Sequence, residues 1–163
     1  MTAGPERGPS RAKAASAAER SQSGPAFWLM KSEPEVYPYS QLVADKKTVW
    51  DGVRNSQARN SLAAMAKGDL VLFYHSHVAE VVGVARVVGE ARPDPTSDDP
   101  RWLAVELAPV KALAEAVTLE TIKRDKALAT MKLVKQSRLS VMPVEPAHFE
   151  RVLELGKTSL PKR

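Results

Sequence analysis

The 163-residue chain contains no cysteine, which excludes both a disulfide framework and a zinc site built on thiolates. A chain without cysteine fits a reducing compartment, so we expect the cytoplasm in a bacterial host or the nucleus in a eukaryotic one. No run approaches the roughly 18 apolar residues of a membrane-spanning helix, and no membrane association is expected. Residues 1–25 also lack the apolar segment of a secretory signal, so none is expected there.

The enzyme motifs that can be recognised from spacing are absent as well. There is no G-x-S-x-G nucleophile elbow, no phosphate-binding P-loop and no H-E-x-x-H zinc motif. We therefore expect a protein that is not an enzyme and carries no cofactor. A small hydrolase or transferase using His75, Glu33 and Ser76 is kept as an alternative, and so is a protein-interaction adaptor.

Charge gives only a mild indication of the partner. The chain has 24 Lys and Arg against 19 Asp and Glu, a formal net charge of +5. Such an excess permits an anionic partner such as nucleic acid but does not require one. The hydrophobic content of 44% is sufficient for a globular core.

The length fits one domain with tails, and we expect a monomer. Residues 1–25 are rich in Ala, Ser, Gly and Pro and show no apolar period. Such a segment cannot bury enough surface to offset its ordering entropy, so it is predicted to be a disordered basic tail. A flexible arm on nucleic acid is the alternative role for it. The folded domain is predicted over residues 26–157, with a C-terminal tail over 158–163.

Hydrophobic patterning predicts short strands interleaved with short helices. Gly83, inside one strand, predicts a bulge or a close backbone approach, and the Pro- and Asp-rich segment 92–100 predicts a loop. There is no βαβ rhythm, so the pattern indicates an α+β fold on a small barrel or curled mixed sheet. The predicted strands are 27–30, 48–50, 69–75, 78–88, 102–110 and 138–144; the predicted helices are a short one capped by Ser40, then 55–66, 118–129 and 146–156.

Several strings, in this order, resemble the EVE domain family. They are Trp28–Pro34 (WLMKSEP), Trp50–Asn55 (WDGVRN), Gln57–Asn60 (QARN), Phe73–Ser76 (FYHS) and Arg138–Ser140 (RLS). The resemblance spans roughly residues 27–155 and is weaker in the 92–100 loop and after Pro109. It implies a PUA-like barrel, related in architecture to YTH and ASCH domains. It also implies binding of DNA or RNA that carries a modified base, with 5-substituted cytosines the most discussed ligands.

A base reader needs an aromatic wall for stacking, and the matching strings supply three candidates. Trp28 and Trp50 are the expected walls, with Tyr74 as a third. The alternative for each is a role in the core, which is the usual fate of a tryptophan in a small domain.

The same strings supply polar groups for the edge of a base. Glu33 follows the first predicted strand, and a carboxylate can accept the exocyclic amine of cytosine; a solvated loop charge is the alternative. We expect Trp28, Glu33, Trp50 and His75 to converge on one concave site. The remaining expected pocket residues are Lys31, Ser32, Asn55, Ser76 and Ser140.

Phosphate binding is predicted at the start of the helix over 55–66. Arg54 and Arg59 bracket a helix N-terminus, which itself attracts anions. The alternative is that either arginine pairs with Asp51. His75 and His77 alternate along a strand and share a face, but a metal site needs further ligands and His148 is remote, so no metal site is expected.

Overall fold

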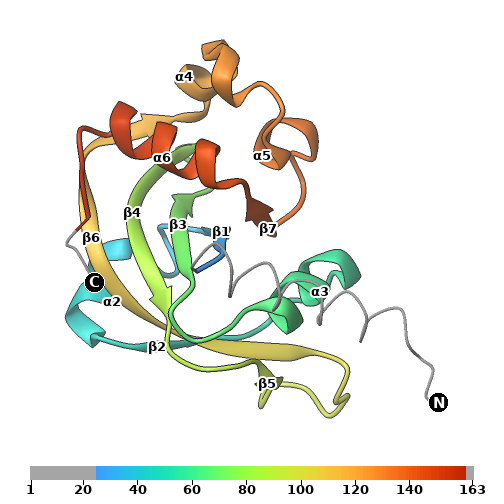
Figure 1. Ribbon diagram of the computed structural model, residues 1–163. Helices are drawn as coiled ribbons and strands as arrows, with labels where there is room; N and C mark the ends of the chain where they lie inside the picture. The colour runs from blue at the N-terminus through green and yellow to red at the C-terminus, as the bar shows by residue number, and fades with distance from the viewer. Residues whose placement is uncertain (1–24, 161–163) are drawn as a thin grey trace.

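The computed structural model describes residues 25–160 as a curled, mixed seven-stranded sheet with short helices packed around it (Figure 1). The predicted basic tail therefore lies almost entirely outside the described residues. The strands are β1 (Phe27–Ser32), β2 (Thr48–Trp50), β3 (Leu70–His75), β4 (Glu80–Val87), β5 (Arg92–Pro93), β6 (Leu103–Thr118) and β7 (Val141–Val144). The helices are α2 (Tyr39–Asp45), α3 (Ser56–Ala64), α4 (Leu119–Arg124), the 3₁₀ turn η1 (Lys126–Leu128), α5 (Lys132–Lys135) and α6 (Pro146–Leu155).

The strand order is β2-β6-β4-β3-β1-β7, and β5 pairs with β6 beside this path. β6 is the long curved strand in Figure 1, and it carries both β2 and β4 as neighbours. The strands curl into a partial barrel, so the α+β fold on a curled mixed sheet that the sequence predicts is confirmed. Within residues 25–160, no helix is long and apolar enough to cross a membrane.

β1 and β3 form a parallel pair, and their shared direction positions the site. Their register ends with Ser32 opposite His75. The ladder continues one step further, because the Ser76 N–H donates to the Ser32 carbonyl at 2.9 Å. The loops after the two strands therefore leave the same edge of the sheet side by side.

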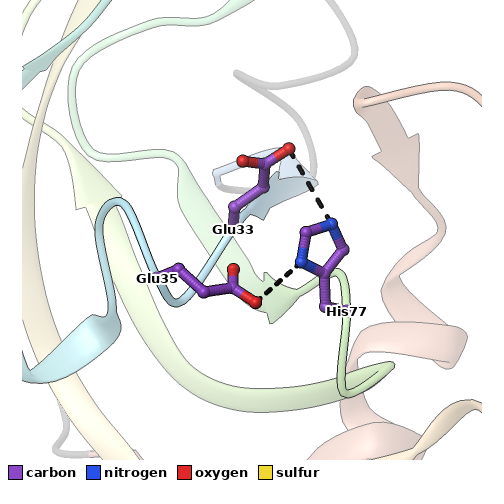
Figure 2. A group of neighbouring side chains, drawn as sticks. All are labelled: Glu33, Glu35 and His77. Atoms are coloured by element: carbon purple, nitrogen blue, oxygen red, sulfur yellow. Dashed lines mark hydrogen bonds and ion pairs between the residues drawn. The ribbon is translucent and has the colours of Figure 1, made fainter.

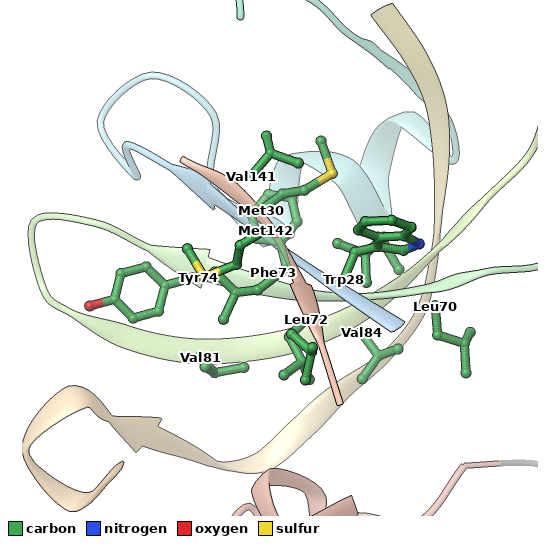
Figure 3. Close-up of a cluster of buried hydrophobic side chains, with 14 of the residues drawn as sticks. Trp28, Met30, Leu70, Leu72, Phe73, Tyr74, Val81, Val84, Val141 and Met142 are labelled. Carbon is green, nitrogen blue, oxygen red and sulfur yellow. The ribbon is translucent and has the colours of Figure 1, made fainter. Parts of the chain in front are cut away.

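The core lies between the curled sheet and its helices, and Trp28 belongs to it (Figure 3). Its side chain is 6% exposed, and its Nε1–H donates to Asp69 Oδ2 at 3.0 Å. Asp69 itself is fully buried and also accepts from the backbone N–H groups of Ala26 and Ala66. Trp28 is thus a core residue whose indole N–H has a hydrogen-bond partner, which was the alternative to its expected role as a stacking wall.

Gly83 shows both features that the sequence predicts for it. The register between β3 and β4 shifts next to it, which marks a bulge. A Cβ at Gly83 would lie 2.6 Å from Cζ of Tyr39, so the ring of Tyr39 packs directly on the glycine backbone. The Tyr39 hydroxyl donates to the Val84 carbonyl at 2.7 Å and fixes the ring there.

Several predicted boundaries are wrong. α2 begins at Tyr39 with Pro38 as its N-cap, so Ser40 lies inside the helix and does not cap it. α3 ends at Ala64, two residues before the predicted end. The helix predicted over 118–129 breaks at Asp125, whose carboxylate accepts from the Ala127 N–H and starts a separate 3₁₀ turn.

β6 is longer than predicted, because Pro109 does not end it. The proline lies opposite Ala85, where the β4–β6 register shifts, and a bulge tolerates a residue that cannot donate a hydrogen bond. The predicted loop at 92–100 contains the short strand β5, and α5 was not predicted. Phe149, Val152 and the start of α6 at Pro146 agree with the prediction.

Candidate nucleic-acid interface

A cavity of about 670 Å³ opens where β1 and β2 end, a size that suits a small ligand. One wall comes from the end of β1 and the loop after it, and the other comes from β2 and the segment that leads to α3. The lining residues are Lys31, Ser32, Glu33, Val36, Tyr37, Thr48, Val49, Trp50, Asp51, Gly52, Val53, Arg54 and Ser140. We call this cavity the pocket.

Trp50 forms a rigid aromatic wall of the pocket. Its indole is only partly buried, and it meets Phe73 and Tyr37 edge-on, with ring centroids 5.5 Å and 6.1 Å away. These contacts on two sides fix the ring while one surface still faces the cavity. Tyr37 lines the pocket too and was not predicted; an aromatic side chain between Pro34 and Pro38 was the available signal.

The opposite wall carries polar groups held by the backbone. Lys31 donates from its backbone N–H to the Ser140 carbonyl at 2.9 Å and from Nζ to the Ser137 carbonyl at 2.6 Å. Partial burial lowers the pKa of Lys31 from its ordinary value. The Ser32 hydroxyl donates to the Tyr37 carbonyl at 2.5 Å. This wall is therefore built before any ligand arrives.

Glu33 lines the pocket, and its side chain lies beside Glu35 and His77 (Figure 2). His77 Nδ1 lies 2.8 Å from Glu35 Oε2, and His77 Nε2 lies 3.9 Å from Glu33 Oε2. The hydrogen bond with Glu35 raises the pKa of His77 and lowers that of Glu35. The imidazole lies between two carboxylates, which stabilise its charged form.

The same three side chains are the group that could hold a metal ion within the described residues. One ligand atom from each lies within 4.8 Å of the others, and all three residues are exposed. From the sequence, His77 was considered as a metal ligand together with His75 instead. Their mutual ion pairing and hydrogen bonding explain the cluster without an ion.

Trp28 and Tyr74 were expected to be aromatic walls of the pocket, but neither lines it. Trp28 lies in the core with its indole nitrogen bound to Asp69. Tyr74 is 3% exposed, and Lys31 Nζ lies 5.6 Å from its ring centroid. Both belong to strands of the sheet interior, whose two faces are covered.

His75 and Ser76 also lie outside the pocket lining. His75 Nε2 accepts the Tyr39 backbone N–H at 3.0 Å, and burial lowers the pKa of His75. The Ser76 hydroxyl contacts the Ser32 carbonyl at 3.4 Å. The expected convergence of Trp28, Glu33, Trp50 and His75 is therefore wrong for two of the four residues. Among residues 25–160, no hydrogen bond or ion pair joins the His75 side chain to Glu33 or Ser76.

Asp94 fixes the second wall of the pocket, and this role was not predicted from the sequence. Its carboxylate is fully buried and accepts hydrogen bonds from Gly52, Arg54 and Thr96. Burial alone would raise its pKa, but these hydrogen bonds hold the pKa far below its ordinary value. The ion pair of Arg54 is thus with Asp94 and not with Asp51.

A cluster of arginines surrounds Trp102, next to the pocket. Arg54, Arg59 and Arg101 each place their guanidinium carbon 5.8 Å from the Trp102 ring centroid. Arg101 pairs with Asp99 at 2.7 Å, whereas Arg59 donates to the neutral Asn60 side chain at 3.1 Å. Of the two arginines predicted to bind phosphate, Arg54 lines the pocket and Arg59 lies beside it.

Comparison with known proteins places this architecture in a family. The EVE domain family model matches residues 26–155. Human thymocyte nuclear protein 1 is 36% identical over 163 residues, which cover 78% of this chain and 72% of that protein. A structure of the human THYN1 protein in complex with 5-methylcytosine-containing DNA superposes with a TM-score of 0.74 at 34% identity. It covers 82% of this chain and 99% of the other.

Two further solved structures extend the comparison. The Rhodopseudomonas palustris protein Rpa0253 is 41% identical, with a TM-score of 0.78 over 81% of this chain and 93% of its own. The YTH domain of Zygosaccharomyces rouxii MRB1 is 19% identical, with a TM-score of 0.53 over 83% of this chain and 88% of its own. The second likeness is one of fold alone, and it agrees with the PUA-like architecture.

Proposed function

This chain belongs to the EVE domain family, and from that membership and the pocket we propose that it is a nucleic-acid-binding module that reads a modified base. The observation that carries the proposal is that Trp50 and Glu33 line the same preformed cavity. The human relative bound to 5-methylcytosine-containing DNA supports a 5-substituted cytosine as the ligand.

In the proposed complex the base stacks on Trp50, a contact worth about 1–3 kcal/mol. The Glu33 carboxylate accepts the exocyclic amine of the cytosine, and the wall of Lys31, Ser32 and Ser140 surrounds the rest of the ring. A duplex hides the edges of its bases, so the target base enters from a single strand or is flipped out of the helix.

The proposed role is recognition without catalysis. The hydrolase or transferase alternative needs His75 near Glu33 and Ser76, but His75 already accepts the Tyr39 N–H from within the fold. We propose that the protein acts as a monomer without a cofactor, in the cytoplasm of a bacterial host or the nucleus of a eukaryotic one. An adaptor that binds only protein is the remaining alternative, and it predicts no response to nucleosides.

The test compares two oligonucleotides that differ only in a central cytosine or 5-methylcytosine, using fluorescence anisotropy. Glu33→Gln keeps the size of the side chain but removes one acceptor for the exocyclic amine, which cytosine and 5-methylcytosine share. Binding of both strands is therefore expected to weaken, and discrimination against a third strand with thymine at the central position is expected to fall by about 1–3 kcal/mol. Trp50→Leu is expected to weaken binding of both strands. Glu90→Gln, an exposed glutamate outside the pocket lining, is the matched control.

A thermal-shift series with free nucleosides completes the test, because a ligand that binds only the folded state raises Tm. We expect at least one 5-substituted cytidine to raise the Tm of the wild type. Equal affinity of the wild type for the two oligonucleotides, together with no response to any modified nucleoside, would contradict the proposed function.

A further inference from the structure

A second cavity, of about 300 Å³, continues the pocket along its rim. It is lined by Asn55, Gln57, Gln136, Ser137, Arg138 and Leu139. The walls of the two cavities are consecutive in the chain on both sides. On one side Arg54 lines the pocket and Asn55 the second cavity; on the other, Ser140 lines the pocket and Leu139 the second cavity. We call the second cavity the flanking groove.

The walls of the flanking groove are fixed by hydrogen bonds. The Asn55 side chain caps α3 by accepting the Ala58 N–H at 2.9 Å. On the other wall, the Leu139 N–H donates to the Gln136 carbonyl at 3.1 Å, and Leu139 itself is buried. The Ser137 carbonyl accepts from Lys31 Nζ, a residue of the pocket, so one side chain ties the two cavities together.

The lining of the flanking groove suits a nucleotide. It offers three primary amides, one hydroxyl and one guanidinium, and none of its lining residues carries a carboxylate. Amides can pair with the donor and acceptor edge of a base, and a guanidinium binds a phosphodiester. The groove also lies at the N-terminus of α3, whose dipole favours an anion.

We propose that the flanking groove binds the nucleotide next to the base held in the pocket. Arg138 contacts the phosphate between the two nucleotides, and Gln57 and Gln136 contact the edge of the neighbouring base. This inference rests on the proposed function and adds to it: the protein reads a modified base together with one neighbour. Recognition therefore depends on sequence context on one side of the modification.

The experiment builds the ligand up one nucleotide at a time. The probes are the nucleoside 5-methyldeoxycytidine and the dinucleotides that extend it on its 5′ or its 3′ side, with affinities measured by calorimetry. We expect one of the two polarities to bind at least about tenfold more tightly than the nucleoside, because only that neighbour reaches the flanking groove.

Variants then test whether the gain in affinity from the neighbouring nucleotide depends on the flanking groove. Arg138→Gln is expected to abolish the gain while leaving the affinity for the nucleoside unchanged. The double variant Gln57→Ala, Gln136→Ala is expected to remove the preference among the four neighbouring bases. Arg124→Gln, an exposed arginine of α4 that lines neither cavity, is the matched control.

The outcomes separate the two proposals. Nucleoside binding without any gain from a neighbour overturns the flanking groove and leaves the proposed function standing. A gain that survives in Arg138→Gln and in the double glutamine variant overturns the groove as well. If the wild type binds no probe, the proposed function is overturned and this inference with it.

Discussion

Asp94 lies 2.8 Å from Arg54 Nη1 and binds it through the oxygen that also accepts the Gly52 N–H, at 2.8 Å. One carboxylate oxygen thus fastens two residues of the pocket wall to a loop 40 or more positions away in the chain. The other oxygen accepts from the backbone and hydroxyl of Thr96. A buried carboxylate needs such partners, since an unpaired charge in the interior is costly.

Asp94→Asn is expected to destabilise the protein and to loosen the pocket wall. The amide has one acceptor oxygen instead of two, so one pair of donors loses its partner at a cost of about 1–3 kcal/mol. Urea denaturation measures the loss of stability, and nucleic-acid binding measures the effect on the wall. Asp98→Asn, at an exposed aspartate of the same loop, is the control and should bind normally. Normal binding by Asp94→Asn would show that the wall holds without this carboxylate.

The same contact predicts how stability depends on pH. The folded-state pKa of Asp94 lies below its unfolded value, so its contribution is present above the unfolded pKa of about 3.9. It is lost as the pH falls through the folded-state pKa. Unfolding free energies of the wild type and Asp94→Asn, measured from pH 6 downward, are therefore expected to converge below about pH 4. A constant difference across that range would contradict the pairing.

His75, the last residue of β3, and His77, just after it, should have pKa values on opposite sides of the ordinary value for histidine. The hydrogen bond with Glu35 raises the pKa of His77, and burial lowers that of His75. NMR titration of the imidazole resonances measures both. Glu35→Gln is expected to bring the pKa of His77 down while changing that of His75 little. A shared pKa for the two rings would show that the contact with Glu35 does not form in solution.

Gly83→Ala is expected to destabilise the fold, because the new methyl group would lie 2.6 Å from the ring of Tyr39. The Tyr39 hydroxyl is bound to the Val84 carbonyl, so the ring has little freedom to move away. Overpacking of this kind costs about 1–3 kcal/mol. Gly89→Ala is the control, since nothing lies within 4 Å of its added Cβ. A Tm equal to that of the control would mean that Tyr39 repacks freely.

The sequence predicted the strands that build the pocket, and the resemblance supplied Glu33 and Trp50. The sequence could not show that Trp50 lines the pocket and Trp28 lies in the core, because both are tryptophans and both belong to strings that resemble the family. The sheet makes the distinction: β1 pairs with β3 and β7 and is covered on both faces, whereas β2 is the terminal strand. Such a difference depends on strand order, which spacing along the chain does not reveal.

Asp94 shows a second limit of sequence reasoning. The segment 92–100 carries three aspartates, and only the fold decides which one is buried against Gly52 and Arg54. Its partners are at least 40 positions away, so no local pattern marks the contact. For the same reason the alternative considered for Arg54 was an ion pair with its close neighbour Asp51.

The ion pair between Arg54 and Asp94 also gives Arg54 and Arg59 different expected roles in binding. Arg54 is held by the buried Asp94, so much of its charge is already neutralised. Arg59 donates to the neutral Asn60 and keeps its full charge for a phosphate. Arg59→Ala is therefore expected to weaken binding to modified and unmodified strands alike. It should also reduce the slope of log K against log salt by about 1.

Arg54→Ala is the informative comparison, because it also removes a cation beside the Trp102 ring but in addition takes the cationic partner from Asp94. Arg54→Ala is expected to lower the stability of the fold and to reduce discrimination between the modified and unmodified oligonucleotides. Its slope of log K against log salt should change less than that of Arg59→Ala. Anisotropy titrations at four or more salt concentrations measure both quantities. If the salt slope of Arg59→Ala equals that of the wild type, Arg59 does not contact phosphate. The strand would then follow the opposite rim, past Arg138.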